Sequence, residues 1–187
     1  MKGMVTNMWA YESVFYQIYP MGFCGVPFEN DGVQRHEIKH VEDWIPHMQK
    51  LGVNAVYFSP VFESDTHGYN TRDYRKIDVR LGTNEDFKEV CDALHRAGIR
   101  VVLDGVFSHT GSDSRYFNRE GRYGEGGAYR DPNSPYRSWY DFDPKYKGGY
   151  RSWWGFETLP EVNEETPSYV EFITGVGGVI DTWLRRG

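Results

Sequence analysis

The chain has 187 residues, of which 39% are hydrophobic, 26% charged and 17% aromatic, and its net charge is −6. This length suits one domain with its own core or a piece of a larger domain. The negative charge and the lack of a basic stripe exclude nucleic acid as the expected partner, because phosphate binding needs a positive field. The aromatic share exceeds what a core of this size needs, which predicts rings at a surface that suits sugars or protein partners.

Cysteine content and hydropathy bear on the compartment. Cys24 and Cys91 are too few for a disulfide framework and lack metal-ligand spacing, which indicates free thiols in a reducing compartment. The N-terminal stretch Met1–Pro20 has no apolar run long enough for a signal peptide. No segment approaches the length of a membrane span. We therefore expect a cytoplasmic protein with no membrane partner.

Three apolar segments predict β-strands, namely Val14–Pro20, Val53–Phe62 and Ile99–Phe107. The second and third are continuously β-branched and aromatic, which is typical of parallel strands buried on both faces. A connection that alternates strands and helices over short loops favours a parallel sheet covered by helices.

Helical periodicity is found between and after these strands. In His36–Gly52 it predicts one helix, kinked or begun near Pro46, with a buried stripe of Ile38, Val41, Trp44, Ile45, Met48 and Leu51. The segment Thr83–Gly98 predicts a helix that starts at a Thr83–Asp86 capping box, buries Phe87, Val90, Cys91 and Leu94, and stops at Gly98. From Thr166, an N-cap candidate before Pro167, we expect two helices separated by the glycines of Gly175–Gly178.

The segment from Ser108 to about Glu165 contains no obvious helix and is rich in Tyr, Trp, Gly, Pro and Arg. A connection of this length is usually functional or a small inserted subdomain. It starts at the carboxyl end of a strand, where α/β folds bind substrates. We call residues 108–165 the excursion.

Polar residues follow the second and third predicted strands. His67, Tyr69 and Asp73 lie in Ser64–Asp78, which is either a polar loop that satisfies its own backbone or a substrate platform with a stacking ring. Asp104 and His109 follow the third strand and are either structural anchors or part of a site. Two adjacent parallel strands would bring both groups to one edge, which favours the functional interpretation.

A third group lies in Ser152–Asn163. Of the paired Trp153 and Trp154, at least one is expected in a small core of the excursion. Glu161 and Asn163 either orient a loop or ligate a cation through oxygen. The Gly175–Gly178 segment lacks the spacing of a dinucleotide-binding fingerprint, and no Ser or Cys stands in a nucleophile-elbow context.

Four ordered motifs resemble the front part of the α-amylase family of glycoside hydrolases, especially its cyclomaltodextrinase and neopullulanase type. "GVNAVYFSPVF" resembles the second barrel strand, and "HGYNTRDYRKIDVRLGTNEDFKEV" resembles the loop and helix that follow it. "DGVFSHT" resembles the signature of the third strand, and "LPEVN" the signature near the end of domain B. The resemblance covers nearly the whole chain from Val14 onward.

The resemblance implies an α/β fold, a (β/α)8 TIM barrel truncated after about three βα units, with a domain B excursion after the third strand. Residues 1–107 would hold three strands and two helices of the catalytic barrel. Residues 108–165 would form domain B, and residues 166–187 a helical return that ends before the fourth strand. A barrel of this kind needs about 250 residues.

The implied activity is retaining hydrolysis of α-1,4 bonds in maltodextrins, starch or cyclodextrins. Retention needs two carboxyl groups about 5–5.5 Å apart at the scissile bond. By resemblance, the nucleophilic Asp, the general-acid Glu and a stabilising Asp lie beyond residue 187, so no catalytic residue is assigned and the isolated chain is expected to be inactive. The residues carried over to substrate binding are His67, Tyr69, Asp104 and His109, with Tyr69 stacking on the sugar and His109 bonding a primary hydroxyl.

Two departures from the family pattern disfavour calcium. Ser108 stands where many amylases have a calcium-binding Asn before the His, and "YPMGF" replaces Asp-Arg-Phe near another calcium loop. We therefore expect no cofactor. The resemblance is compatible with a homodimer of the full-length enzyme. Two alternatives stay open, namely an α-glucosyl transferase or isomerase on the same scaffold and a non-catalytic sugar-binding homologue.

Overall fold

The computed structural model describes residues 8–187. Residues 1–7 lie outside the described residues. They include the start of the predicted 1–107 portion and of the N-terminal stretch in which no signal peptide is expected. In the described part the strands are β1 (Phe15–Ile18), β2 (Ala55–Phe58), β3 (Phe62–Ser64), β4 (Thr71–Ile77) and β5 (Arg100–Leu103). The α-helices are α1 (Pro20–Phe23), α2 (His40–Asp43), α3 (Ile45–Lys50), α4 (Asn84–Arg96), α5 (Pro167–Thr174) and α6 (Val179–Leu184). None of the helices in residues 8–187 is long and apolar enough to cross a membrane.

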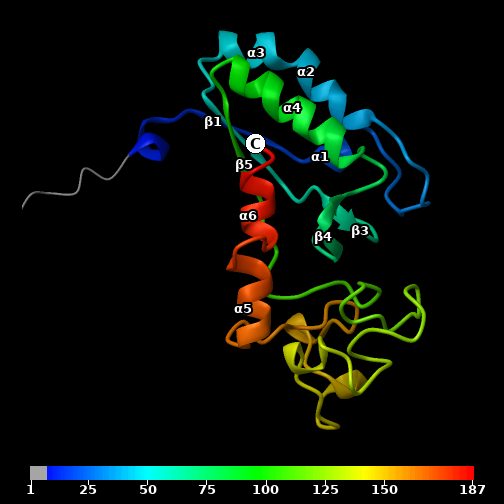
Figure 1. Cartoon of the computed structure of the whole chain (residues 1–187). Helices are drawn as coiled ribbons and strands as arrows, with labels where there is room; N and C mark the ends of the chain where they lie inside the picture. Colours follow the sequence, from blue (N-terminus) through cyan, green and yellow to red (C-terminus); the bar gives the residue numbers. More distant parts are fainter. Residues whose placement is uncertain (1–7) are drawn as a thin grey trace, which may run out of the picture.

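The three predicted strands form a parallel sheet in the order β1-β2-β5, with Phe15 opposite Ala55 and Ala55 opposite Arg100. Figure 1 shows α2, α3 and α4 side by side over this sheet. The prediction of burial on both faces is confirmed for β2 only. The residues of β5, which is an edge strand of the sheet, are half-buried or exposed.

The segment Ser64–Asp78 does more than form a loop. Its second half is β4, which pairs antiparallel with β3. The charges of "TRDYRK" conceal this strand from hydropathy, because the charged Arg72 and Asp73 are buried in ion pairs instead of facing water. His67 and Tyr69 lie in the turn between the two strands.

Helix predictions are confirmed to different degrees. In α4 the Thr83–Asp86 capping box is present and the predicted apolar residues are buried. The segment His36–Gly52 is broken instead of forming one helix, with Glu37–Lys39 in a 3₁₀ turn before α2 and with Pro46 in the first turn of α3. The break rotates Trp44 and Leu51 out of the expected buried stripe, so that they are 42% and 54% exposed.

The return from the excursion consists of the two expected helices, α5 and α6, separated at Gly175–Gly178. Pro167 lies in the first turn of α5, but Thr166 makes no side-chain cap and donates its hydroxyl to Ser138 O instead. In Figure 1 the two helices run end to end from the excursion to the sheet.

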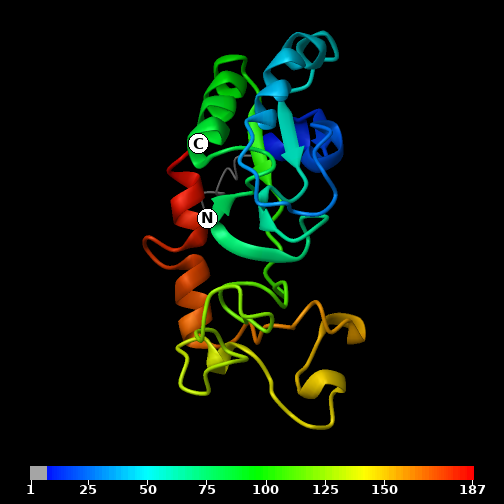
Figure 2. The ribbon, with the colours of Figure 1, turned by 90° about the vertical axis from the view of Figure 1, so that its right-hand side faces the viewer.

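The excursion contains only short 3₁₀ turns and isolated bridges, for example between Tyr140 and Val162. Figure 2 shows it on the far side of the β3–β4 hairpin from the sheet. Its core is aromatic and includes Tyr116, Phe117, Trp139, Tyr140 and Tyr150. The prediction that Trp153 or Trp154 fills this core is wrong, since both side chains are exposed.

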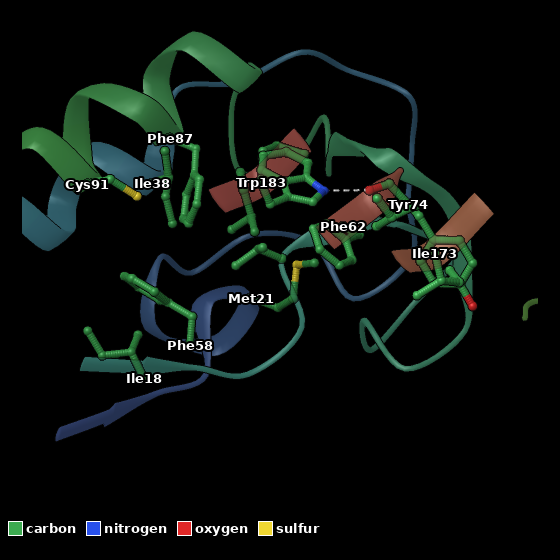
Figure 3. Packing of buried hydrophobic residues seen from close by; sticks show 14 of the residues in the cluster. Ile18, Met21, Ile38, Phe58, Phe62, Tyr74, Phe87, Cys91, Ile173 and Trp183 are labelled. Atoms are coloured by element: carbon green, nitrogen blue, oxygen red, sulfur yellow. Dashed lines mark hydrogen bonds between the residues drawn. The ribbon is translucent and has the colours of Figure 1, made fainter. Parts of the chain in front are cut away.

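Tyr74 of β4 joins the two parts of the core. Its ring stacks on Tyr116 of the excursion at 5.5 Å between centroids, and it contacts Phe62 at 6.4 Å. Its carbonyl accepts a 2.7 Å hydrogen bond from Trp183 Nε1 of α6, drawn in Figure 3. One hydrophobic core therefore runs from the sheet through the hairpin into the excursion.

Candidate functional site

The carboxyl ends of the three parallel strands meet at one edge of the sheet. Ser59, after β2, donates its backbone N–H to Ile18 O of β1, and Asp104, after β5, donates its own to Phe58 O of β2. The ladder thus aligns the residue that follows each strand. This edge is the place where α/β folds bind ligands.

The turn of the β3–β4 hairpin places Tyr69 over this edge. Tyr69 Oη donates a 3.3 Å hydrogen bond to Asp104 Oδ2, and its side chain is 40% exposed. The tight turn depends on Gly68, whose φ of +95° suits glycine and whose added Cβ would come within 3.1 Å of Pro60 O. The turn and the third parallel strand therefore share one hydrogen-bonded pair.

His67 lies beside Tyr69, with ring centroids 6.0 Å apart. Its Nδ1 accepts a 3.1 Å hydrogen bond from the Tyr69 backbone N–H, and its carbonyl accepts one from Tyr19 Oη. Burial lowers the pKa of His67. The negative charge of Asp65 opposes this shift, and the positive charge of Arg80 reinforces it. A neutral imidazole with its Nδ1 used as an acceptor carries its proton on Nε2, which makes that atom a hydrogen-bond donor.

His109 lies beneath the turn and is 5% exposed. Its Nε2 is 2.9 Å from Tyr69 O and its Nδ1 is 3.1 Å from Ser108 Oγ. Because a carbonyl only accepts, Nε2–H must donate to Tyr69, which leaves Nδ1 to accept from the serine hydroxyl. Burial lowers the pKa of His109, which favours this neutral form. Both ring nitrogens are thus occupied by the protein.

The four predicted residues therefore form one connected group, with Tyr69 at its centre. We call His67, Tyr69, Asp104 and His109 the rim. Tyr69 and Asp104 are accessible at its surface, whereas His109 supports the turn from below.

Tyr57 was missed by sequence reasoning. Burial, with an added interaction with Asp104, raises the pKa of this β2 side chain to about 12, which keeps the phenol protonated and able to donate to that carboxylate. Within an apolar run, Tyr57 looked like an ordinary strand residue. The sequence did contain a clue, because a tyrosine near the carboxyl end of a parallel strand can supply a hydroxyl donor to a site at that edge of the sheet.

The catalytic-domain description of the α-amylase family matches residues 17–177. The chain belongs to this family. The match includes every residue of the rim and the whole excursion.

Individual relatives are similar over most of the chain. An amylopullulanase of Thermoanaerobacterium saccharolyticum is 34% identical over 86% of the chain, and neopullulanase 2 of Thermoactinomyces vulgaris is 32% identical over 97%. The chain spans only 16% and 33% of the lengths of these two proteins. The solved structure of ligand-free cyclic α-maltosyl-(1→6)-maltose hydrolase from Arthrobacter globiformis superposes with a TM-score of 0.74 at 27% identity, over 96% of this chain and 43% of that one. Cyclomaltodextrinase is among the other similar proteins, in agreement with the type that the motifs indicated.

Ser108, Glu161 and Asn163 are the side chains for which the sequence raised the question of a calcium site. Ser108 uses its hydroxyl on His109, and Asn163 Oδ1 accepts from the backbone N–H of Glu165. Glu161 is paired with Arg151 at 2.7 Å. In residues 8–187, no three His, Cys, Asp or Glu side chains gather as a metal site. Ser108, Glu161 and Asn163 are each bonded to another protein group and do not gather as a set of calcium ligands.

Proposed function

We propose that this chain is the sugar-holding front part of a retaining α-glucan hydrolase that acts on α-1,4 bonds of maltodextrins, starch or cyclodextrins. The observation that carries the proposal is the Tyr69–Asp104 hydrogen bond, which joins the hairpin turn to the end of β5 at the substrate edge. The membership of the family supports the substrate class, and the names of relatives such as neopullulanase and cyclomaltodextrinase agree with it.

Each member of the rim has a role in this proposal. The half-exposed Tyr69 ring stacks on a glucose face, Asp104 accepts from sugar hydroxyls, and His67 donates through Nε2. His109 is a positioning residue in the observed geometry, because its two nitrogens hold Tyr69 and Ser108. To bond a primary hydroxyl of the sugar, it would have to exchange one of these partners.

The test is calorimetric titration of the chain with maltotriose. We expect saturable binding that Tyr69→Ala abolishes and that Tyr11→Ala, which removes an 86% exposed tyrosine distant in sequence from the rim, leaves unchanged. Equal affinities in the two variants would contradict the role of the rim.

Cleavage is measured separately. By analogy with the family, the attacking and proton-donating carboxyl groups lie outside this chain, so maltoheptaose is expected to stay intact after long incubation. Release of shorter sugars at an appreciable rate would contradict this placement of the catalytic groups.

We also propose a cytoplasmic location, which the free thiols of Cys24 and Cys91 support. Burial raises the pKa of each thiol to about 12, so neither is a reactive thiolate at neutral pH.

A further inference from the structure

Arg80, which follows β4, has a fully buried side chain. It forms a two-point ion pair with the equally buried Asp78, with Nε 2.8 Å from Oδ1 and Nη2 2.8 Å from Oδ2. Removing two charges from water is costly, and apolar side chains of similar volume often give the same or greater stability at such a position. Stability of the core alone therefore does not explain this pair.

The other donors of Arg80 bind carbonyl groups of two separate segments. Nη1 donates to Pro27 O at 3.0 Å and to Phe28 O, both in the loop that follows α1. Nη2 donates to Thr66 O at 2.8 Å, in the turn of the β3–β4 hairpin. The guanidinium carries five N–H donors in one rigid plane, so it fixes the directions of its partners as well as their distances. One side chain thus connects the loop after α1 to the hairpin turn.

The carbonyl of Thr66 belongs to the same planar peptide group as the backbone N–H of His67. Arg80 therefore sets the orientation of the peptide that leads into this rim residue. The carbonyl of His67 accepts a 3.3 Å hydrogen bond from Tyr19 Oη. The His67 ring in turn accepts from the backbone N–H of Tyr69 at 3.1 Å. Arg80 is thus linked to Tyr69 through a short series of contacts within one turn.

The charge of Arg80 also acts on side chains at this turn. Burial is the main cause of the lowered pKa of His67, and Arg80 reinforces the shift while Asp65 opposes it. Burial is likewise the main cause of the raised pKa of Tyr19, which Arg80 opposes and Asp78 reinforces. The buried guanidinium therefore favours the neutral imidazole of His67, whose Nε2–H is free to donate at the rim.

We propose that Arg80 is a positioning residue for sugar binding, which fixes the hairpin turn against the loop after α1 and so holds His67 and Tyr69 in the arrangement that receives the sugar. This inference rests on the proposed function, because it takes the rim as the sugar-binding surface. Arg80 is fully buried and acts only through the turn. A role in the core alone would change how easily the protein unfolds but not the affinity of the folded molecules.

The first test removes the guanidinium with and without the charge of its partner, in the 187-residue chain. Arg80→Met leaves Asp78 as an unpaired buried carboxylate and should lower the urea concentration at half-unfolding. The double variant Arg80→Met/Asp78→Asn leaves no charge in this place, so most of that stability should return. Both variants should nevertheless bind maltotriose about tenfold more weakly or worse in calorimetric titration, the factor expected if about one molecule in ten keeps the competent turn.

Leu94→Ala is the matched control. It removes a fully buried side chain from α4 and destabilises the protein at a position that makes no contact with the hairpin turn through Arg80. Its affinity for maltotriose should equal that of the parent protein. A weaker affinity in the stable double variant than in the unstable Leu94→Ala variant cannot be attributed to loss of folded protein.

A second test reads the turn without the sugar. Arg80→Ala leaves a space beside the Asp78 carboxylate and the Thr66 carbonyl that a free guanidinium ion can occupy. The amide NMR signals of Gly68 and Tyr69 should move in this variant. Millimolar guanidinium chloride should return them to their parent positions and restore maltotriose binding, whereas sodium chloride at equal ionic strength should do neither.

The outcomes separate this inference from the proposed function. If the parent protein and the double variant bind maltotriose equally well, the positioning role is refuted and the rim stands. If the parent protein binds no maltotriose, the proposed function fails, and the amide signals decide whether Arg80 fixes the turn. Parent-like signals of Gly68 and Tyr69 in Arg80→Ala would refute that role. It would also be refuted if guanidinium raised the stability of Arg80→Ala without restoring the signals of the turn.

Discussion

Residues 15–107 and the excursion belong to one core but are stabilised in different ways. In the first region, hydrogen bonds of the parallel ladder and of α4 satisfy the backbone, and apolar residues at regular spacing fill the core. In the excursion, side chains take over this task, as when Asn118 Nδ2 donates to Gly124 O and Gly126 O. Aromatic rings pack around Phe117, whose centroid is 4.6 Å from that of Tyr150. A long irregular segment can thus be well ordered when its own side chains pair with its backbone.

The two regions are joined by buried charges as well as by rings. Arg72 of β4 is 2% exposed and pairs with Asp113 of the excursion and with Asp65 of the hairpin turn. Arg115 of the excursion pairs with Asp73 of β4 at 2.6 Å. The hairpin is therefore bound to both regions, so we expect the two to unfold together.

The largest expected effect comes from removing the central ring of the excursion. Phe117→Ala should lower the free energy of unfolding by about 3–5 kcal/mol, because the ring is fully buried and the site cannot collapse around the gap. The matched substitution in the first region is Leu94→Ala in α4, with an expected cost of about 2–5 kcal/mol. Urea unfolding followed by fluorescence and by circular dichroism should show one transition in each variant. A separate early transition for Phe117→Ala alone would mean that the excursion is an independent unit.

A smaller effect is expected from the buried ion pairs of Arg72, which connect the hairpin to the excursion. Arg72→Met should cost about 3 kcal/mol, near the lower end for a broken buried pair, because Asp65 is half-exposed and can be rehydrated. Asp113 limits the cost further, since burial already raises its pKa against the opposing charge of Arg72, and without that charge it can take up a proton. Arg35→Met, at a solvent-exposed pair with Asp31, is the control and should cost much less, because water screens the attraction between exposed charges. An equal decrease in the free energy of unfolding in the two variants would show that the buried ion pairs of Arg72 stabilise the protein no more than an exposed pair does.

The sequence predicts features that depend on neighbouring residues better than features that depend on residues distant in the chain. The parallel strands and the Thr83 cap follow from local pattern, because each depends on neighbours within a few residues. The strand character of Arg72 and Asp73 does not, because their charges are neutralised by partners about forty residues away. Trp44 was misplaced for a related reason, since the 3₁₀ turn and Pro46 interrupt the period that the prediction extended.

For the candidate site, motif resemblance selected the four residues that the structure brings together as the rim, but it could not reveal their orientation. The position of His109 beneath the turn depends on a hydrogen bond to the Tyr69 carbonyl. Every residue has such a backbone group, so the residue types alone do not predict this contact. Tyr57 was overlooked because the carboxylate near its hydroxyl, Asp104, follows β5 and is far from Tyr57 in the sequence. Contacts between elements distant in sequence are the part that residue patterns do not encode.

The smallest expected effect is a pH dependence at the junction of the two regions. Burial lowers the pKa of His109 in the folded protein, although the nearby Glu161 carboxylate opposes this shift and His67 reinforces it. The unfolded chain, with a histidine pKa of about 6.5, therefore binds the proton more readily than the folded one. The free energy of unfolding should accordingly be constant above about pH 7.5 and decrease as the pH falls through about 6.5.

His109→Gln tests this assignment, because the glutamine amide can still donate to the Tyr69 carbonyl and accept from Ser108 but cannot take up a proton. Denaturant titrations at intervals from pH 8 to pH 5.5 should show a shallower decline for this variant than for the parent protein, with His67→Gln acting in the same direction. His95→Gln removes an exposed imidazole from α4 and controls for the loss of a histidine as such. A decline that stays as steep in His109→Gln as in the parent would mean that His109 binds its proton as readily in the folded protein as in the unfolded chain, so that its titration does not cause the pH dependence.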